Sequence, residues 1–267
     1  MRGIIIAAGL GSRMGTLTTD RPKCMLPIHG RPLLHHTMDH MAAAGCHEFV
    51  VIVGYKAETV EAQGATIVEN KNFAHNNILH SLMSASDYLE GSVMCSYSDI
   101  WVEPEIHRKL VEADGDIVIA VDDDWMPYYE GREHHPVPEA ENVFFDDQHQ
   151  VRQIGKHLHP EEADHFHCGE FLGLWRMNEK GTAHFRKTFE QLDDRLSEDK
   201  PFQQAAHWRT AYITDMVQEI TDTGPPVGCA VIQRGWAELD TVEDYERLDS
   251  IAERQRLLKL CEFQKDQ

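Results

Sequence analysis

Short apolar runs alternate with amphipathic stretches along most of the chain, and each kind of pattern predicts a different element. Buried strands are predicted at residues 4–6, 49–53, 65–68, 92–97, 117–121, 170–175 and 227–232. Helices are predicted at residues 32–44, 78–89, 105–113, 182–192, 213–221 and 244–260, and a short one begins at Ala57. Because strands alternate with helices, the pattern predicts an α/β fold of right-handed βαβ units with a mainly parallel sheet.

The alternation breaks in residues 122–168. Residues 122–138 read DDDWMPYYEGREHHPVP and mix acids, aromatic rings and prolines without a period, which favours a loop or lid. Residues 142–155 then predict a hairpin that turns at residues 146–150. We therefore predict one domain over residues 1–267, in which residues 122–168 form an insertion on the substrate side.

Composition narrows the class of protein and its partners. With 267 residues, 42% of them hydrophobic and 26% charged, the chain is long enough for a sizeable buried core. The 25 basic residues face 45 acidic ones, and a formal net charge of -20 argues against a nucleic-acid partner or an anionic membrane surface.

The sequence also predicts a compartment. No apolar run approaches the roughly 20 residues that span a bilayer, and residues 4–8 are too short for the core of a signal peptide. The six cysteines are scattered without a C-x-x-C pair, so reduced thiols and a cytoplasmic location are expected. The oligomeric state stays open, a homodimer included.

The most informative stretch is residues 2–27, RGIIIAAGLGSRMGTLTTDRPKCMLP. Gly9, Gly11 and Gly15 let backbone N–H groups approach an anion closely, as in a phosphate-binding nest. Residues 1–38 hold five arginines and lysines but a single acid, Asp20. A cationic start on an acidic chain indicates an anionic ligand, although a strand and turn with surface arginines would show the same charges.

Two familiar phosphate motifs do not fit this stretch. A dinucleotide fingerprint needs a third glycine where Met14 stands, and no Gly-Lys-Ser/Thr run marks a Walker A loop. The stretch instead resembles the signature of the sugar-nucleotidyltransferase superfamily, roughly A-A-G-x-G-(S/T)-R-(M/L)-x-x-L-T-x-x-x-P-K. The matching residues are Ala7, Ala8, Gly9, Gly11, Ser12, Arg13, Met14, Leu17, Thr18, Pro22 and Lys23. This resemblance implies a Rossmann-like fold of the GT-A type, three-layered, with a mostly parallel mixed sheet.

The resemblance also implies roles for single residues. Nucleotide contacts are expected from Ala7, Ala8, Gly9, Gly11, Ser12, Arg13 and Lys23. Lys23 would stabilise the α-phosphate and the incoming oxygen, while Arg13 and the amides of residues 9–15 would hold the β- and γ-phosphates. Lys23 and Arg13 are therefore the expected catalytic residues.

Two acids far apart in the sequence are the candidate metal ligands. Asp99 follows a predicted strand, and ligands of open α/β sheets bind beyond the carboxyl ends of strands. Asp240 lies in GWAELDTVEDY, which resembles the closing motif Trp-x-Glu-Ile/Leu-Asp-Thr-x-x-Asp of the cytidylyltransferase branch. The resemblance implies Mg²⁺ on both aspartates, whereas a turn residue and a helix cap remain the plainer interpretations. The sequence leaves open whether the two carboxyl groups meet.

The phrase ENKNFAHNNILHSL at residues 69–82 points to the same branch. An Asn-Asn-x-x-x-Ser-Leu pattern resembles the phosphocholine cytidylyltransferase type, and sugar-phosphate enzymes more often carry Gly-Thr-Ala there. Asn76, Asn77 and Ser81 are therefore candidates near the nucleobase or the substrate, although a loop followed by a helix cap at Asn77 fits the spacing equally well.

The insertion supplies candidates for the acceptor site. Trp125, Tyr128 and Tyr129, with the acids of residues 122–124, would suit a small cation such as choline or an alkyl-ammonium. An aromatic loop packed on the sheet is the alternative. Further polar candidates are Arg132, Glu141, Lys156 and Glu170.

Several histidines crowd the end of the insertion. The cluster holds His157, His159, His165, His167 and Cys168. Its spacing matches no standard zinc motif, so chance clustering on a polar loop is favoured and metal binding is left open.

Together these features predict an Mg²⁺-dependent cytidylyltransferase. It would transfer CMP from CTP to phosphocholine, phosphoethanolamine, 2-aminoethylphosphonate or a similar monoester and release pyrophosphate. Such acceptors are already ionised (second pKa about 6), so no general base is needed. The alternatives are a sugar-1-phosphate nucleotidyltransferase using UTP, dTTP or GTP, and a catalytically silent nucleotide-binding regulatory protein. A dinucleotide-dependent oxidoreductase is disfavoured by Met14.

Overall fold

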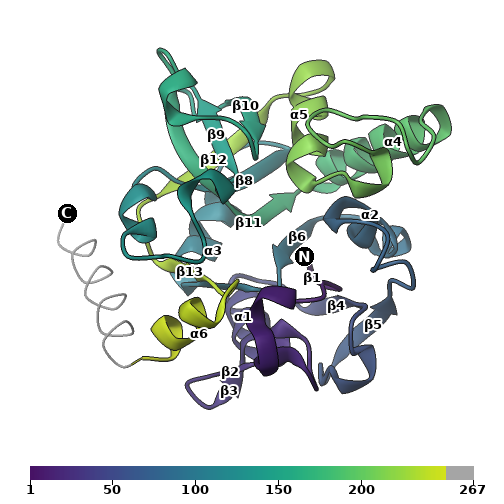
Figure 1. Ribbon diagram of the computed structural model, residues 1–267. Coiled ribbons are helices and arrows are strands. Elements are labelled where there is room, and N and C mark those ends of the chain that lie inside the picture. The colour runs from purple at the N-terminus through teal and green to yellow at the C-terminus, as the bar shows by residue number, and fades with distance from the viewer. Residues whose placement is uncertain (251–267) are drawn as a thin grey trace.

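The computed structural model describes residues 1–250, and a nine-stranded sheet forms its centre (Figure 1). The sheet has the order β10-β9-β11-β6-β1-β4-β5. Off this path, β8 pairs with β11, and β12 pairs with β8. Its strands are β1 (Arg2–Ala7), β4 (Glu48–Val53), β5 (Ala65–Glu69), β6 (Val93–Tyr97), β8 (Ile117–Asp122), β9 (Asn142–Phe145), β10 (Val151–Gly155), β11 (His167–Met177) and β12 (Val227–Ile232). Two short ribbons lie beside it: β2 (Pro27–Ile28) with β3 (Arg31–Pro32), and β7 (Ile100–Val102) with β13 (Trp236–Glu238).

Within this sheet, β10 and β11 run against the other strands. β1 pairs in parallel with β4 and β6, and β4 pairs in parallel with β5. β11 is antiparallel to β6, β8 and β9, so β8 and β9 share the direction of β6. β12 is parallel to β8, and β10 is antiparallel to β9. The predicted α/β fold with a mostly parallel mixed sheet is confirmed.

Helices cover both faces of the sheet and make three layers (Figure 1). They are α1 (Leu33–Ala43), α2 (Ile78–Met83), α3 (Pro104–Glu112), α4 (Glu179–Arg195), α5 (Ile213–Thr223) and α6 (Val242–Asp249). Ile4 and Ile6 pack in the core shared with α2, α4 and α5, whereas Ile5 packs in the core shared with α1, α3 and α6. This alternation follows from the period of two in a strand and gives β1 two buried faces.

Most predicted elements lie within a few residues of the observed ones, and the deviations have local causes. The helix predicted for residues 78–89 stops at Met83 and gives way to a 3₁₀ turn over Ser86–Tyr88. The Ser84 hydroxyl donates to the carbonyl of Ser81, a local bond that competes with helix continuation. The predicted hairpin is confirmed, because β9 and β10 are antiparallel. The part of the last predicted helix beyond residue 250 lies outside the described residues.

The segment between β8 and β9 packs onto the core. Trp125, Tyr128 and Tyr129 are buried there with side chains from α1 and α3. The single-domain organisation with an insertion at residues 122–168 stays a prediction.

Candidate active site

A cleft lies at the carboxyl-terminal ends of β1 and β6, and we name it the central cleft. It is lined by these predicted site residues: Ala7, Gly9, Gly11, Arg13, Lys23, Asn77, Asp99, Lys156, Glu170 and Asp240. The other predicted site residues do not line it: Ala8, Ser12, Ser81, Trp125, Tyr128, Tyr129 and Arg132. The cleft thus unites residues that are more than 200 positions apart in the chain.

Glycine is required in the turn after β1. Gly11 has φ 61° and Gly15 has φ 55°, the left-handed region that other residues rarely adopt. A Cβ atom on Gly11 would also lie 3.0 Å from the Lys23 side chain. The turn therefore keeps its backbone bare and brings Lys23 close to it, while the Arg13 side chain stays 47% exposed.

Lys23 joins the two candidate metal ligands. Its Nζ donates to Asp99 Oδ2 at 2.8 Å and to Asp240 Oδ1 at 2.5 Å. Arg13 donates to the other oxygen of Asp240 at 2.7 Å. The question left open by the sequence is answered: both carboxyl groups lie on the same side of the sheet and face one ammonium group.

The charges of this cluster stabilise one another. Burial alone would lower the pKa of Lys23, but the carboxylates of Asp99 and Asp240 raise it overall. Burial likewise works to raise the pKa of Asp240, yet Lys23 and Arg13 hold it well below its usual range. Lys23 is therefore positively charged and Asp240 negatively charged at neutral pH.

Asp240 is positioned by Asp244, which forms the capping box of α6 with the N-cap residue Thr241. Asp244 Oδ2 accepts hydrogen bonds from the backbone N–H of Asp240 at 3.1 Å and of Thr241 at 2.8 Å. Its other oxygen accepts from Arg132 Nε at 2.9 Å, and the Arg132 side chain is completely buried. The loop that carries Asp240 is thus tied to the inserted segment by a buried ion pair.

The structure places the predicted acceptor-binding rings, Trp125, Tyr128 and Tyr129, outside the lining of the central cleft. They are 2%, 6% and 6% exposed. The guanidinium carbon of Arg132 lies 4.7 Å from the ring centroid of Tyr128 and 5.0 Å from that of Tyr129. The rings therefore hold a cation of the chain itself, and Arg132 supports the cleft from outside rather than lining it.

Four glutamates line the central cleft instead: Glu139, Glu141, Glu170 and Glu238. Burial raises the pKa of Glu141 to about 7 and that of Glu170 to about 8, and it raises the pKa of Glu238 well above its usual range. Glu170 Oε1 accepts a hydrogen bond from Tyr129, while its Oε2 has no hydrogen-bond partner among residues 1–250. The cleft therefore offers several carboxyl groups that a cationic ligand would satisfy.

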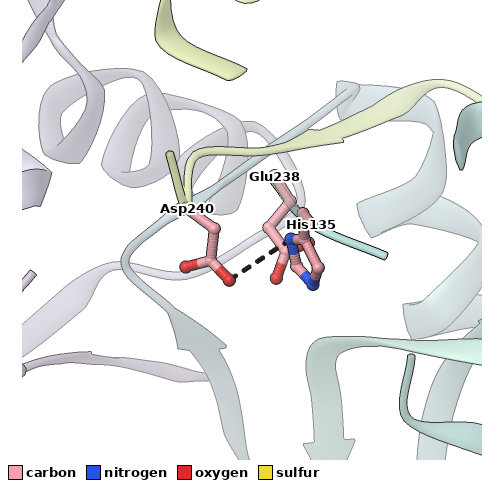
Figure 2. A group of neighbouring side chains, drawn as sticks. All are labelled: His135, Glu238 and Asp240. Atoms are coloured by element: carbon pink, nitrogen blue, oxygen red, sulfur yellow. Dashed lines mark ion pairs between the residues drawn. The ribbon is translucent and has the colours of Figure 1, made fainter. Parts of the chain in front are cut away.

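His135, Glu238 and Asp240 gather in the same wall, and their side chains face one another in Figure 2. His135 Nδ1 lies 3.3 Å from Glu238 Oε2 and 3.5 Å from Asp240 Oδ2. It also accepts a hydrogen bond from Arg132 at 2.7 Å, since a guanidinium can only donate. That bond occupies the Nδ1 lone pair, so a metal ion could bind this nitrogen only if Arg132 moved away.

Within residues 1–250, the histidine-rich stretch at residues 157–168 supplies no group of three potential metal ligands. His165 contacts Asp164 and His167 contacts Asp147, both at the surface. Among the described residues, the group at His135 is the one in which three potential metal ligands converge. The sequence did not reveal that His135 meets Glu238 and Asp240, because nothing in its spacing relates it to residues about 100 positions later.

The asparagine phrase acts mainly within the chain. Asn77 lines the cleft, but its Oδ1 caps α2 and its Nδ2 donates to the carbonyl of Thr210. Ser81 is buried and accepts a hydrogen bond from Asn70, whose amide also pairs with Asn76. The hydroxyl of Ser81 therefore serves an internal network, and Ser81 does not line the central cleft.

Sequence reasoning missed two rings of the cleft, Tyr97 and Tyr212. The ring of Tyr97 fits against Gly173, which has φ 74° and whose added Cβ would lie 2.2 Å from that ring. The register of β11 shifts at this glycine. A lone glycine inside a predicted strand was the available signal for such a close approach.

Comparisons with known proteins agree on the class of fold and chemistry. Residues 3–172 match the family described as MobA-like NTP transferase domain. The chain is 24% identical to the CTP:phosphoglutamine cytidylyltransferase of Campylobacter jejuni over 92% of this chain and 98% of that protein. It is 30% identical to the CMP-5'-(3-aminopropyl)phosphonate synthase of Streptomyces rubellomurinus over 84% of this chain, a match that spans 37% of that protein.

A solved structure supports the fold. The CTP:phosphocholine cytidylyltransferase from Streptococcus pneumoniae superposes with a TM-score of 0.68 at 19% identity, covering 94% of this chain and 98% of that one. At this identity the likeness establishes the fold alone. No helix within residues 1–250 combines the length and apolar character needed to cross a membrane.

Proposed function

The chain belongs to the MobA-like NTP transferase domain family, and from this premise we propose that it transfers CMP from CTP to a small phosphate or phosphonate monoester, releasing pyrophosphate. The observation that carries the proposal is the contact of one ammonium group, Lys23 Nζ, with both Asp99 and Asp240 beside the glycine turn. Relatives named for CTP and for phosphate or phosphonate substrates support the choice of nucleotide and acceptor.

The reaction is a displacement at phosphorus. An oxygen of the acceptor attacks the α-phosphorus of CTP, and the bond from that phosphorus to the oxygen bridging to the β-phosphate breaks. Pyrophosphate leaves with the electron pair. Because the acceptor oxygen is already ionised, the chain has no proton to remove, and its task is alignment and charge stabilisation.

The residues divide this task by position. Lys23 is buried, but the two carboxylates keep it positively charged at the place where the α-phosphate would react. Arg13, half exposed at the rim, and the bare backbone of Gly9 and Gly11 would bind the outer phosphates.

Mg²⁺ fits the donor set of this centre. Asp99 and Asp240 both contact the ammonium group of Lys23, so their carboxylates lie close together. Mg²⁺ prefers few carboxylates together with phosphate oxygens and water, which two such groups would allow. Asp99 and Asp240 would hold it, and when bound it would neutralise phosphate charge.

For the acceptor we propose an ammonium-bearing monoester. The support is the set of glutamates, Glu141, Glu170 and Glu238, which line the cleft in place of the predicted aromatic cage. A cation beside them would offset the cost of burying carboxylates near a polyanionic nucleotide.

The test is pyrophosphate release with CTP, UTP, dTTP and GTP, each offered with phosphocholine, phosphoethanolamine, 2-aminoethylphosphonate and glucose-1-phosphate in the presence of Mg²⁺. We expect CTP with an amino-bearing acceptor to give a kcat/KM at least tenfold above every other nucleotide. Turnover of UTP with glucose-1-phosphate instead would identify a sugar-1-phosphate nucleotidyltransferase. Nucleotide binding without turnover in any pair would identify a silent regulatory protein.

A further inference from the structure

Lys156 is a basic side chain of the central cleft that the proposed reaction does not use. Among the described residues that line the cleft, the other arginine and lysine side chains are Arg13 and Lys23, which contact Asp240. Lys156 follows β10, and its Nζ pairs with Glu139 at 3.3 Å. It also lies 5.2 Å from the ring centroid of Tyr212. Glu139 and Tyr212 are therefore partners that Lys156 does not share with the Lys23 centre.

The pair that Lys156 forms is easily exchanged. The side chain of Glu139 is 42% exposed and that of Lys156 is 26% exposed. Ion pairs at this degree of exposure contribute little stability, because water solvates both charges almost as well. An anionic group of a ligand can therefore replace Glu139 at small cost and keep Lys156 over the ring of Tyr212.

Glu141 places a carboxyl group in the same cleft as Lys156. Burial raises the pKa of Glu141, and the charge of Lys156 partly offsets that rise. Yet the ion pair of Lys156 is with Glu139, and the side-chain hydrogen bond of Glu141 is a long one, 3.5 Å, from the hydroxyl of Tyr97. A carboxyl and an ammonium group thus line one cleft without neutralising each other directly.

An α-amino acid carries its own ammonium and carboxylate on a single carbon, so it can satisfy both groups at once. Resting on the proposed function, we propose that the acceptor is an amino-acid-like phosphate or phosphonate monoester, with its ammonium directed to Glu141 and its carboxylate to Lys156. An acceptor that carries an ammonium group but no carboxylate would leave Lys156 paired with Glu139. The relative named for phosphoglutamine acts on an amino-acid derivative, which agrees with this assignment.

Two matched pairs of acceptors test the proposal, since the members of each pair differ by one carboxylate. They are O-phosphoserine against phosphoethanolamine, and 2-amino-3-phosphonopropionate against 2-aminoethylphosphonate. With CTP and Mg²⁺ we expect kcat/KM to be at least tenfold higher for the carboxylated member of at least one pair. Lys156→Met should bring that ratio close to one, and Lys156→Glu should reverse it.

The control is Lys180→Met, because Lys180 is exposed on α4 outside the cleft and should keep the wild-type ratio. Equal or better use of the carboxylate-free acceptors by the wild type would overturn this inference and leave the proposed function intact. An unchanged ratio in Lys156→Met would overturn it as well. Failure of all four acceptors with CTP would overturn the inference together with the amino-bearing acceptor of the proposed function.

Discussion

Replacing Lys23 with methionine is expected to lower kcat/KM for CTP-dependent pyrophosphate release by about 10²–10³-fold, the loss typical for one preorganised charge donor at a reacting centre. Its Nζ contacts Asp99 at 2.8 Å and Asp240 at 2.5 Å, so the substitution removes the positive charge that both carboxylates face. Methionine keeps most of the length of the side chain and removes the charge. Steady-state kinetics with saturating Mg²⁺ measure the effect.

The same substitution has a signature without substrate. The carboxylates of Asp99 and Asp240 would lose the cation that they share, and the melting temperature of the free protein should fall. Mg²⁺ should then raise the melting temperature of Lys23→Met more than that of the wild type. Lys180→Met serves as the control for both readouts. Activity within fivefold of wild type in Lys23→Met would contradict the role of Lys23.

Replacing Arg132 with methionine is expected to lower the free energy of unfolding by about 3–5 kcal/mol, as for other buried ion pairs that lose one partner. The Arg132 side chain is fully buried, and its Nε donates to Asp244 at 2.9 Å. Without it, Asp244 stays buried and charged beneath the loop of Asp240. Urea unfolding followed by circular dichroism measures the change.

Two further variants isolate the cause. Arg152→Met breaks an ion pair with Asp146 in which the arginine is 52% exposed, and it should cost at most about 1 kcal/mol. The double variant Arg132→Met/Asp244→Asn should be less destabilised than the sum of the single variants, because it leaves no unpaired charge. Strict additivity would show that Arg132 stabilises the protein through ring packing alone.

The features predicted most accurately from the sequence are those that depend on the local pattern of residues. Apolar runs identify β1, β4, β6 and β12 because buried parallel strands need apolar residues on both faces. The glycine turn with Lys23 was recognisable because backbone conformation and phosphate chemistry restrict those positions strongly. Asp99 was found through its place at a strand end.

Contacts between side chains that are far apart in the sequence could not be predicted, because they depend on the folded arrangement and not on local pattern. In the sequence, Tyr128 and Tyr129 beside acids fit a cage for a cationic ligand as well as a packed loop. Only the fold shows that the guanidinium of Arg132 lies over both rings. His135 meets Asp240 across a separation of 105 positions, and no periodicity records such a contact. β7 and β13 were missed because three-residue strands carry too short a pattern.

The central claim is that Asp99, Asp240 and Lys23 form one reacting centre for the transfer of CMP. The most direct measurement is the amount of CMP-linked product, identified by mass, that forms from CTP, Mg²⁺ and the best amino-bearing acceptor. The account predicts that the wild type and Asp194→Asn, a change on the exposed side of α4, form this product, and that Asp99→Asn and Asp240→Asn each form about 10²-fold less. Product formation at the wild-type rate in both of the latter variants would contradict it.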